Sequence, residues 1–470
     1  MKKLWLSSFI LITSITSYAQ STIENRLTSA FDRLENDRQM AHGSVSFTVA
    51  DAEEGKIIFQ KNGSIGLSPA SSQKIFTAIA SYSILGQDFH FKTILGYTGK
   101  VEDGVLNGNL ILTGYGDPTL GSWRYDGYKP EDVEKKIFAA LAKNDIRAVN
   151  GDIIIDDSKF SMQPTPGGWP WNDMGNYYGA PNWGFNWLEN QYDITYHPAS
   201  KLGDTVSIVR TNVALPNVIF LNNIKTGHSD EGDNSYIYLP PYGNVAVLTG
   251  SIPYGKNTTS SGSVPNPPLL FAKQLQTWMQ KRNFYTIGSF LAANQLVMQH
   301  KKVPEIKTVL DTLFSPNMDQ MMYYFLHKSI NLYGESFAKY LGYQEAKEGA
   351  TDAGVQVIRD FWEKKDIGNN DLKMMDGSGL SPQNYVTSTA EVKALLFAQK
   401  QNWFDAFYKA LPDYNGTKMK SGTIHGCKAY AGYQTSKSGK KYVFSLIINN
   451  YDGGHDALVQ KMYQLLNVLK

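Results

Sequence analysis

The sequence predicts a mixed α/β (α+β) fold, in which helices flank a central antiparallel sheet and β-rich domains are inserted. Three observations predict it. Helical and strand-like patterns alternate in the first 88 residues, strand-like patterns followed by a helix close the chain, and a long stretch of short alternating runs lies between them. Because both ends of the chain supply hairpins, we expect one sheet built from both termini.

The first 19 residues have the pattern of a secretory signal peptide. Lys2 and Lys3 precede a short apolar stretch, and the small residues Ser17 and Ala19 fit cleavage before Gln20. A membrane anchor is the alternative, but about a dozen apolar residues are too few to span a bilayer comfortably. We therefore predict an exported, periplasmic protein with at most peripheral membrane contact.

The next segments predict a helix, a hairpin and a second helix. Ile23, Leu27, Phe31 and Leu34 fall on one helical stripe, and "SVSFTVA" and "KIIFQK" alternate at strand period around "DAEEG". The stretch "SPASSQKIFTAIA" (68–80) then starts a helix with an apolar face. These elements supply the N-terminal half of the sheet and its first covering helices.

The C-terminal end mirrors this order, and the middle of the chain differs from both ends. "KAYAGYQT" and "KYVFSLIINN" flank the turn "SKSGK", and "DALVQKMYQLLNVL" follows as an amphipathic helix. Residues 89–290 read as β-rich inserts, and 251–268 as a turn-rich linker. Helical patterning resumes in "PLLFAKQLQTWMQKRN" and in "MDQMMYYFLHKSINLYGESFAKYLGYQEA".

Composition and motif content exclude several functions. The 45 basic and 43 acidic residues nearly balance, so we expect no nucleic-acid partner. The eight histidines are scattered, and no G-x-S-x-G, HExxH, P-loop or G-x-G-x-x-G motif occurs, so we predict neither a metal nor a cofactor. Cys427 is the single cysteine, which excludes an intramolecular disulfide, and its strand-like flanks favour a packing role.

A serine and a lysine near the start of the second helix have the spacing of a nucleophile and its base. Ser71 stands three residues before Lys74, so both side chains lie on one helical face. A lysine can accept the serine proton if burial leaves it neutral, and free N–H groups at the helix start can hold an oxyanion. The alternative is an ordinary helix cap by Ser68, Ser71 or Ser72.

The S-x-x-K pattern is weak alone, because it recurs at Ser336 and at Ser438. Two further elements strengthen it, since S-x-x-K enzymes pair this motif with S-D-N and K-T-G. The unit 329–331, "SIN", supplies a hydroxyl and a carboxamide, whereas 315–317, "SPN", reads as a turn that caps a helix.

K-[ST]-G occurs three times, at 225–227, 420–422 and 437–439. The first lies in a polar loop and the last forms a hairpin turn. Only Lys420-Ser421-Gly422-Thr423 leads directly into an apolar strand. There the cation and the hydroxyls could bind a terminal carboxylate, while Gly422 lets the substrate backbone approach.

Together these motifs resemble those of the penicillin-recognising serine peptidases, and closely those of the low-molecular-mass class C group, the D-alanyl-D-alanine carboxypeptidase/endopeptidases. The matching segments come in the family's order across most of the chain: "PASSQK", "NLILTGYGDPTL", "VNGDIIIDDSKF", "WPWNDMGNYYGAP", "SINLYGE", "DGSGLSPQN" and "MKSGTIHGCKAYAGY". The triplets S-I-N and K-S-G stand where many relatives have S-D-N and K-T-G.

The resemblance implies a transpeptidase/β-lactamase-like catalytic domain with two inserted domains. The expected division is a signal peptide (1–19), a catalytic domain (20–88 and 270–470), a β-rich domain II (89–195 and 250–269) and a nested domain III (196–249).

The resemblance also implies a role for each candidate site residue. Ser71 would be acylated, Lys74 would be its base, and Ser329 would pass the proton to the leaving amine. The remaining expected roles are these: Asn331 holds the acyl-side peptide, Lys420 completes a positive pocket, Ser421 and Thr423 grip the terminal carboxylate, and the N–H groups of Ser71 and Thr423 form the oxyanion hole. Asp173 would meet the amine of a diaminopimelate side chain, although a loop or helix cap is an equal alternative.

The implied function is a D-Ala-D-Ala carboxypeptidase/DD-endopeptidase that acts on peptidoglycan muropeptides and is trapped by β-lactams as a long-lived ester. A β-lactamase or esterase on the same fold is one alternative, which the long insert argues against. An inactive wall-binding or penicillin-sensing protein is the other, which the full set of hydroxyls and lysines argues against.

Overall fold

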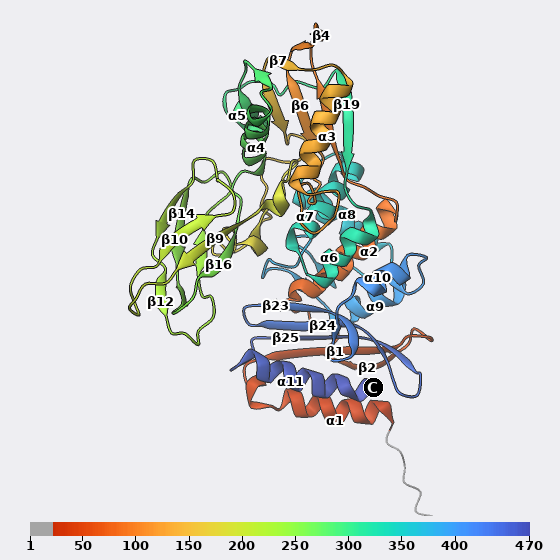
Figure 1. The fold of residues 1–470 in the computed structure, drawn as a ribbon. Coiled ribbons are helices and arrows are strands. Elements are labelled where there is room, and N and C mark those ends of the chain that lie inside the picture. The colour runs from red at the N-terminus through yellow and green to blue at the C-terminus, as the bar shows by residue number, and fades with distance from the viewer. Residues whose placement is uncertain (1–21) are drawn as a thin grey trace, which may run out of the picture.

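A six-stranded antiparallel sheet built from both ends of the chain organises the catalytic half of the molecule (Figure 1). The computed structural model describes residues 22–470. The strand order is β2-β1-β25-β24-β23-β22, so N-terminal β1 pairs with C-terminal β25. The predicted single sheet is confirmed. Its strands are β1 (Ser44–Asp51), β2 (Ile57–Lys61), β22 (Asp413–Tyr414), β23 (Thr417–Ile424), β24 (Cys427–Thr435) and β25 (Lys441–Asn449).

Helices cover both faces of this sheet (Figure 1). On one face, α1 (Ile23–Glu35) and α11 (His455–Leu466) lie side by side and bury the predicted stripe, Leu27, Phe31 and Leu34. The other face carries a helical cluster around α2 (Lys74–Leu85). Its other members are α6 (Met318–His327), α7 (Asn331–Leu341), α8 (Thr351–Glu363), α9 (Ser388–Ala398), α10 (Phe404–Ala410) and the strand pair β20 (Leu372–Lys373) and β21 (Tyr385–Val386).

Helix α2 differs from the sequence prediction, which gave it one apolar face. Every residue from Lys74 to Tyr82 is buried, because helices and sheet surround the helix on all sides. Large apolar side chains such as Phe76 pack around it, and the Phe76 ring meets Trp362 edge-on at 5.5 Å. A helix enclosed in this way holds the short turn before it, which carries Ser71, in a rigid frame.

The first insert contains two sheets and three helices. The strands of its five-stranded sheet are β3 (Lys92–Tyr97), β6 (Leu110–Gly114), β8 (Ile153–Asp156), β18 (Phe290–Ala292) and β19 (Thr308–Phe314). Those of the four-stranded sheet are β4 (Lys100–Glu102), β5 (Val105–Asn107), β7 (Ala148–Asn150) and β17 (Tyr285–Thr286). The helices are α3 (Pro130–Lys143), α4 (Pro267–Lys281) and α5 (Ala293–Met298).

The second insert is built from strands and lies beside the first (Figure 1). Its three sheets have the orders β10-β9-β16, β11-β14-β13 and β12-β15. The strands are β9 (Gln191–His197), β10 (Ser207–Thr211), β11 (Ile219–Asn222), β12 (Lys225–Gly227), β13 (Tyr236–Tyr238), β14 (Val245–Thr249), β15 (Ser251–Pro253) and β16 (Thr258–Ser263).

The strand pairing differs from the expected domain boundaries. Residues 270–314 were assigned to the catalytic domain, but β18 and β19 pair with β8 and β3 of the first insert. Similarly, β9 pairs with β10 on one side and with β16 on the other, so β9 and β16 both belong to the nested unit. We therefore propose a first insert of 89–190 and 264–314, a nested insert of 191–263, and a catalytic domain that resumes after Phe314.

Two local predictions in the middle of the chain were wrong. The linker predicted at 251–268 contains β15, which pairs with β12, and β16, a polar Ser/Thr run that becomes a strand because it pairs with β9. The stretch that forms α3 was read as β-rich, although Val133, Ile137 and Leu141 form a buried helical stripe.

The prediction of an exported protein concerns the N-terminus and membrane-spanning segments. The predicted signal peptide, 1–19, lies outside the described residues. None of the helices in the described part of the chain combines the length and the apolarity needed to cross a membrane.

Cys427 is buried and its thiol donates to the Ser68 carbonyl oxygen at 2.8 Å. Burial raises the pKa of that thiol to about 12, as expected of a packing residue.

Candidate active site

Ser71 lies in a tight turn that precedes α2. Residues Ala70–Gln73 form a 3₁₀ turn, and Ala70 has a positive φ of 49°. Backbone strain of this kind persists only where the surroundings enforce it. Two glycines let the surrounding chain pack directly against this turn, because a Cβ on Gly379 would overlap the Ala70 carbonyl oxygen and a Cβ on Gly422 would overlap the Pro69 carbonyl oxygen.

The role of Gly422 therefore differs from the sequence prediction. The prediction was that the missing side chain lets the substrate backbone approach. The space is instead filled by the chain itself, since the position of a Cβ on Gly422 is also 2.9 Å from the Ser72 nitrogen and 3.1 Å from the Ser71 nitrogen. The glycine allows β23 to pack against the turn that carries Ser71.

The Lys74 amine is buried and touches the Ser71 hydroxyl. Its Nζ lies 3.0 Å from Ser71 Oγ, 2.6 Å from Asn331 Oδ1 and 2.6 Å from the Ser378 carbonyl oxygen. The last two partners can only accept hydrogen bonds. A neutral amine that gives its two N–H groups to them directs its lone pair at the Ser71 hydroxyl. This is the arrangement that a general base requires.

Burial makes the neutral amine accessible near neutral pH. It lowers the pKa of Lys74 to about 7, and the negative charges of Asp376 and Glu335 oppose this shift without cancelling it. Burial also raises the pKa of Glu335 to about 8, so much of this carboxyl is protonated at neutral pH. The surroundings thus keep Lys74 near the balance between its two forms.

This pKa predicts the acid side of the pH–rate profile. Below about pH 7 Lys74 is an ammonium and cannot accept the Ser71 proton, so kcat/KM should fall about tenfold per pH unit. As the pH rises through 7, the neutral form accumulates and the rate should level off. The acylation rate with benzylpenicillin, measured from about pH 5 to about pH 8, checks this expectation. A rate that stays constant down to pH 5 would contradict it.

Ser329 and Asn331 lie where α6 ends and α7 begins. Ser329 has a positive φ of 58° and accepts a hydrogen bond from Lys420 Nζ at 2.9 Å. Because the Lys420 amine is the donor in this bond, the Ser329 O–H remains free to donate. The Asn331 amide accepts from Lys74 and donates through Nδ2 to the Tyr178 carbonyl oxygen at 2.7 Å. A backbone carbonyl of the insert thus fixes the orientation of this amide.

Lys420 extends from β23 beneath the site. It is buried, and its Nζ donates to Ser329 Oγ and to the Ser421 carbonyl oxygen at 2.8 Å. Burial and the charges of Lys74 and Lys428 lower its pKa well below the usual value. Ser421 Oγ donates to the Tyr414 hydroxyl at 3.3 Å and is not among the residues that line the cleft, whereas Thr423 lines it. The predicted carboxylate role of Ser421 stays a prediction.

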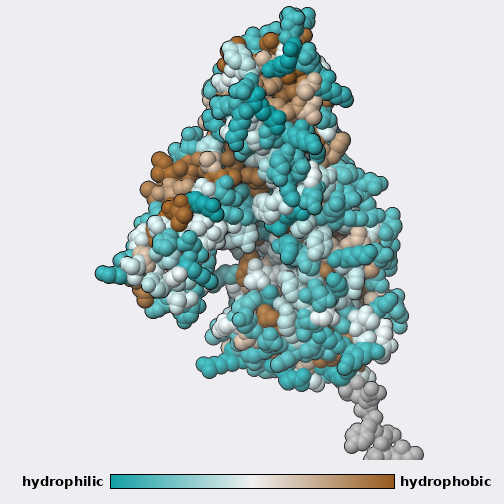
Figure 2. Space-filling view, in the orientation of Figure 1, coloured by the Kyte–Doolittle hydropathy of each residue, from teal (hydrophilic) through white to brown (hydrophobic). Residues whose placement is uncertain are grey.

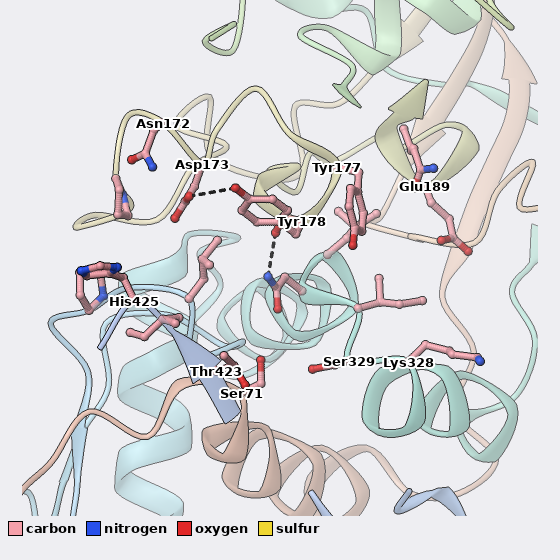
Figure 3. A pocket seen from close by; sticks show the side chains of 18 of the residues that line it. Ser71, Asn172, Asp173, Tyr177, Tyr178, Glu189, Lys328, Ser329, Thr423 and His425 are labelled. Atoms are coloured by element: carbon pink, nitrogen blue, oxygen red, sulfur yellow. Dashed lines mark hydrogen bonds between the residues drawn. The ribbon is translucent and has the colours of Figure 1, made fainter. Parts of the chain in front are cut away.

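A cleft of about 930 Å³ opens above Ser71, between the inserts and the catalytic domain. Figure 2 shows the surface hollowed where the nested insert faces the catalytic sheet. Ser71, Ser329 and Thr423 lie on the catalytic side of the cleft, and Asp173 and Tyr178 face them from the insert (Figure 3). The cleft therefore brings most of the predicted site residues together.

Asp173 lies in the cleft wall, as predicted. Its Oδ1 accepts a hydrogen bond from the Tyr178 hydroxyl at 3.2 Å, and burial raises its pKa (Figure 3). The side chain is half-buried and caps no helix of the described residues, whereas its bond to Tyr178 lies within its own loop. His425, which follows Thr423, lies below Asn172 and Asp173 on the opposite side of the cleft.

The competing motifs have structural roles. In 315–317, Asn317 caps α6 through the Gln320 nitrogen. Lys339 of the second S-x-x-K pair is buried in α7, where its Nζ donates to the carbonyl oxygens of Gln163, Pro164 and Asn182. This lysine holds the insert against the catalytic domain.

Several residues at the site were missed by the sequence prediction. Asp376 lies beside Lys74 and accepts from the Trp169 indole N–H at 2.9 Å. The segment "DGSGLSPQN" contains it, but the segment was used only for the resemblance. Tyr178 contributes a backbone carbonyl, for which no side-chain pattern exists. Lys428 contacts Thr423 from the neighbouring strand, and no motif includes it.

Comparison with known proteins identifies the family. The model of the D-Ala-D-Ala carboxypeptidase 3 (S13) family matches residues 27–468. A D-alanyl-D-alanine carboxypeptidase DacB from Haemophilus influenzae is 24% identical over 443 residues, covering 89% of this chain and 88% of the relative.

Two solved structures confirm the predicted fold class. The crystal structure of penicillin binding protein 4 from Haemophilus influenzae has a TM-score of 0.79 at 23% identity and covers 94% of this chain and 98% of that chain. The same protein complexed with a novel β-lactam gives a TM-score of 0.73 at 21% identity, with the same coverage of both chains. The family match extends over nearly the whole described chain and includes every motif at the site. The chain therefore belongs to the D-Ala-D-Ala carboxypeptidase 3 (S13) family of serine peptidases.

Proposed function

We propose that the protein carries out the serine DD-peptidase activity of its family at Ser71, on peptidoglycan stem peptides and cross-links. The observation that carries this proposal is the Lys74 amine, whose two acceptor-only partners direct its lone pair at the Ser71 hydroxyl. Such a pair can form an acyl-enzyme without a histidine or a metal.

In the acylation step, Lys74 takes the Ser71 proton while Oγ attacks the carbonyl carbon of the penultimate D-Ala. The oxyanion that forms would be held by the N–H groups of Ser71 and Thr423. Among the described residues, the Ser71 N–H has no hydrogen-bond partner, which leaves it available for this role. The carbon–nitrogen bond then breaks, and the proton passes through Ser329 to the leaving amine.

The leaving group is D-Ala in the carboxypeptidase reaction and a diamino acid of the neighbouring stem in the endopeptidase reaction. Water then hydrolyses the Ser71 ester and regenerates the hydroxyl. In both reactions the residue after the scissile bond carries a carboxylate. Lys420, together with the hydroxyls of Ser421 and Thr423, would bind it.

Asp173 is proposed to bind the amine of a diaminopimelate side chain. Its carboxyl faces the cleft from the insert, on the side opposite Thr423 and His425. A substrate amine would form a charge-assisted hydrogen bond with it and would lower its raised pKa.

The proposed substrate also agrees with the proposed cellular location. Peptidoglycan lies outside the cytoplasmic membrane, which fits cleavage of residues 1–19 and a periplasmic location. β-Lactams resemble the D-Ala-D-Ala end, and the complex of penicillin binding protein 4 with a β-lactam supports their assignment as covalent inhibitors.

Acylation by benzylpenicillin tests the proposal. We expect a stable adduct in the intact mass, which peptide mapping assigns to the peptide that contains Ser71. A Ser68→Ala variant is a matched control in the same peptide, because the buried Ser68 hydroxyl has no hydrogen-bond partner within residues 22–470. This variant should keep the adduct. A folded protein that forms no adduct, or forms it at another residue, would refute the proposal.

The choice between the two peptidase reactions needs separate substrates. Incubation with a pentapeptide that ends in D-Ala-D-Ala measures release of D-Ala. Incubation with purified cross-linked muropeptides measures the appearance of monomers. The ratio of the two rates assigns the dominant reaction.

A further inference from the structure

Lys428 lies directly beside Thr423 on the neighbouring strand of the sheet. The two residues are opposite each other in the β23–β24 pairing, and Lys428 Nζ donates to Thr423 Oγ1 at 2.8 Å. Thr423 lines the cleft, whereas the Lys428 side chain is buried behind it, with only 6% of the residue exposed. The lysine therefore contacts the cleft through the threonine hydroxyl.

This contact determines how the Thr423 hydroxyl can bond. A hydroxyl has one O–H donor and two acceptor lone pairs, and an ammonium is only a donor. Lys428 therefore occupies a lone pair, and the O–H must point elsewhere. Within residues 22–470, no residue accepts a hydrogen bond from the Thr423 O–H. An anion in the cleft would supply one.

Within the described part of the chain, Lys428 also has no carboxylate counter-ion. The ion pairs of the described residues include neither Lys428 nor Lys420. The Tyr430 ring lies 4.7 Å from Lys428 Nζ and compensates part of the lost hydration. Burial lowers the Lys428 pKa to about 8, so the group is mostly charged at neutral pH. A buried Lys428 cation beside the buried Lys420 amine, neither of them paired with a carboxylate among residues 22–470, favours an anionic ligand.

We propose that Lys428 is a positioning residue that holds the Thr423 hydroxyl as a donor to the terminal carboxylate of the substrate and adds positive charge to that pocket. The inference rests on the proposed function, in which Thr423 meets this carboxylate. It adds a residue from β24 that determines the preference for substrates with a free carboxylate after the scissile bond.

A comparison of two substrates tests the role of Lys428. One is an acyl-D-Ala-D-Ala peptide, and the other is the same peptide with a terminal carboxamide. For the Lys428→Met variant we expect kcat/KM on the carboxylate peptide to fall about tenfold, mainly through KM. The carboxamide peptide should be nearly unaffected. Lys428→Arg, which retains a charged donor, should restore most of the preference.

Two further variants separate positioning from a general effect on the sheet. Lys441→Met makes the same change at an exposed lysine of β25 and should leave both peptides unaffected. In a Thr423→Val background, the Lys428→Met change should cost clearly less than in the parent, because the hydroxyl that it positions is gone. Thermal melting confirms that each variant is folded.

The outcomes distinguish this inference from the proposed function. Equal loss on both peptides would show a merely structural role and would overturn the inference, as would no loss on either. If the parent enzyme releases neither D-Ala from the carboxylate peptide nor D-alaninamide from the carboxamide peptide, and cleaves no cross-linked muropeptide, the proposed function fails. In that case the acylation rates with benzylpenicillin and with its methyl ester give the same comparison of a free with a blocked carboxylate. The Lys428→Met variant must then bring the ratio of these two rates closer to one.

Discussion

The Lys74→Met variant should fold and yet acylate with benzylpenicillin about 10²–10⁴ times more slowly than the parent enzyme. Methionine has a similar length and no proton-accepting nitrogen. The Ser71 hydroxyl would keep its place in the 3₁₀ turn but lose the group that takes its proton. The time course of the intact mass with benzylpenicillin measures this rate directly.

Lys339→Met is the matched control for Lys74→Met. Both lysines end an S-x-x-K motif, both are buried, and burial lowers the pKa of each to about 7. Each replacement leaves buried carbonyl oxygens without a donor, so each should lower the free energy of unfolding by about 2 kcal/mol.

Only the change at Lys74 should lower the acylation rate of the folded protein. If Lys74→Met acylates within tenfold of the parent, another group is the base. If Lys339→Met loses acylation to the same extent, the loss reflects packing rather than proton transfer.

Ser71 and Lys74 could be predicted from the sequence because their relation is local. Three residues of one helical turn fix the distance between the hydroxyl and the amine, whatever surrounds the helix. Ser329 and Lys420 could be predicted as parts of separate motifs, since each belongs to a recognisable triplet, S-x-N or K-[ST]-G. Their contact at 2.9 Å, across 91 positions of the chain, is a finding of the structure; the order of the motifs in the family implied only that both belong to one site.

The remaining features of the site depend on tertiary contacts that leave no pattern in the sequence. The Asn331 amide is oriented by the carbonyl oxygen of Tyr178, 153 residues earlier in the chain. Lys428 acquires its role from strand register, and the close approach at Gly422 depends on where the turn at Pro69 meets the sheet. In each case the partner is a backbone atom or a residue of another strand.

The same reason explains the errors in the fold. Strand β16 is polar and becomes a strand because β9 supplies its hydrogen-bond partners, so propensity alone suggested a linker. The boundary at 270 failed because β18 and β19 return to the first insert after α4. Sequence patterns gave the type of most elements, whereas the pairing of distant strands decided which domain each one joins.

The Gly422→Ala variant should lose at least about 10² in acylation rate, although it changes no reacting group. A Cβ at this position would overlap the Pro69 carbonyl oxygen and would crowd the backbone nitrogens of Ser71 and Ser72. All three are backbone atoms, so no side-chain rotation can relieve the clash. The turn must move away from β23, and Ser71 then leaves both Lys74 and the Thr423 N–H of the proposed oxyanion hole.

Gly66→Ala is the matched control, five residues before Ser71. A Cβ there would meet only the Tyr385 Cβ, at an ordinary contact distance of 3.6 Å. This variant should keep the parent acylation rate and melting temperature, while Gly422→Ala should lower both. If Gly422→Ala acylates at the parent rate, the contact between β23 and the turn does not position the nucleophile. If Gly66→Ala loses activity as well, the segment before Ser71 tolerates no added methyl group, and the loss at Gly422 is not specific to the strand contact.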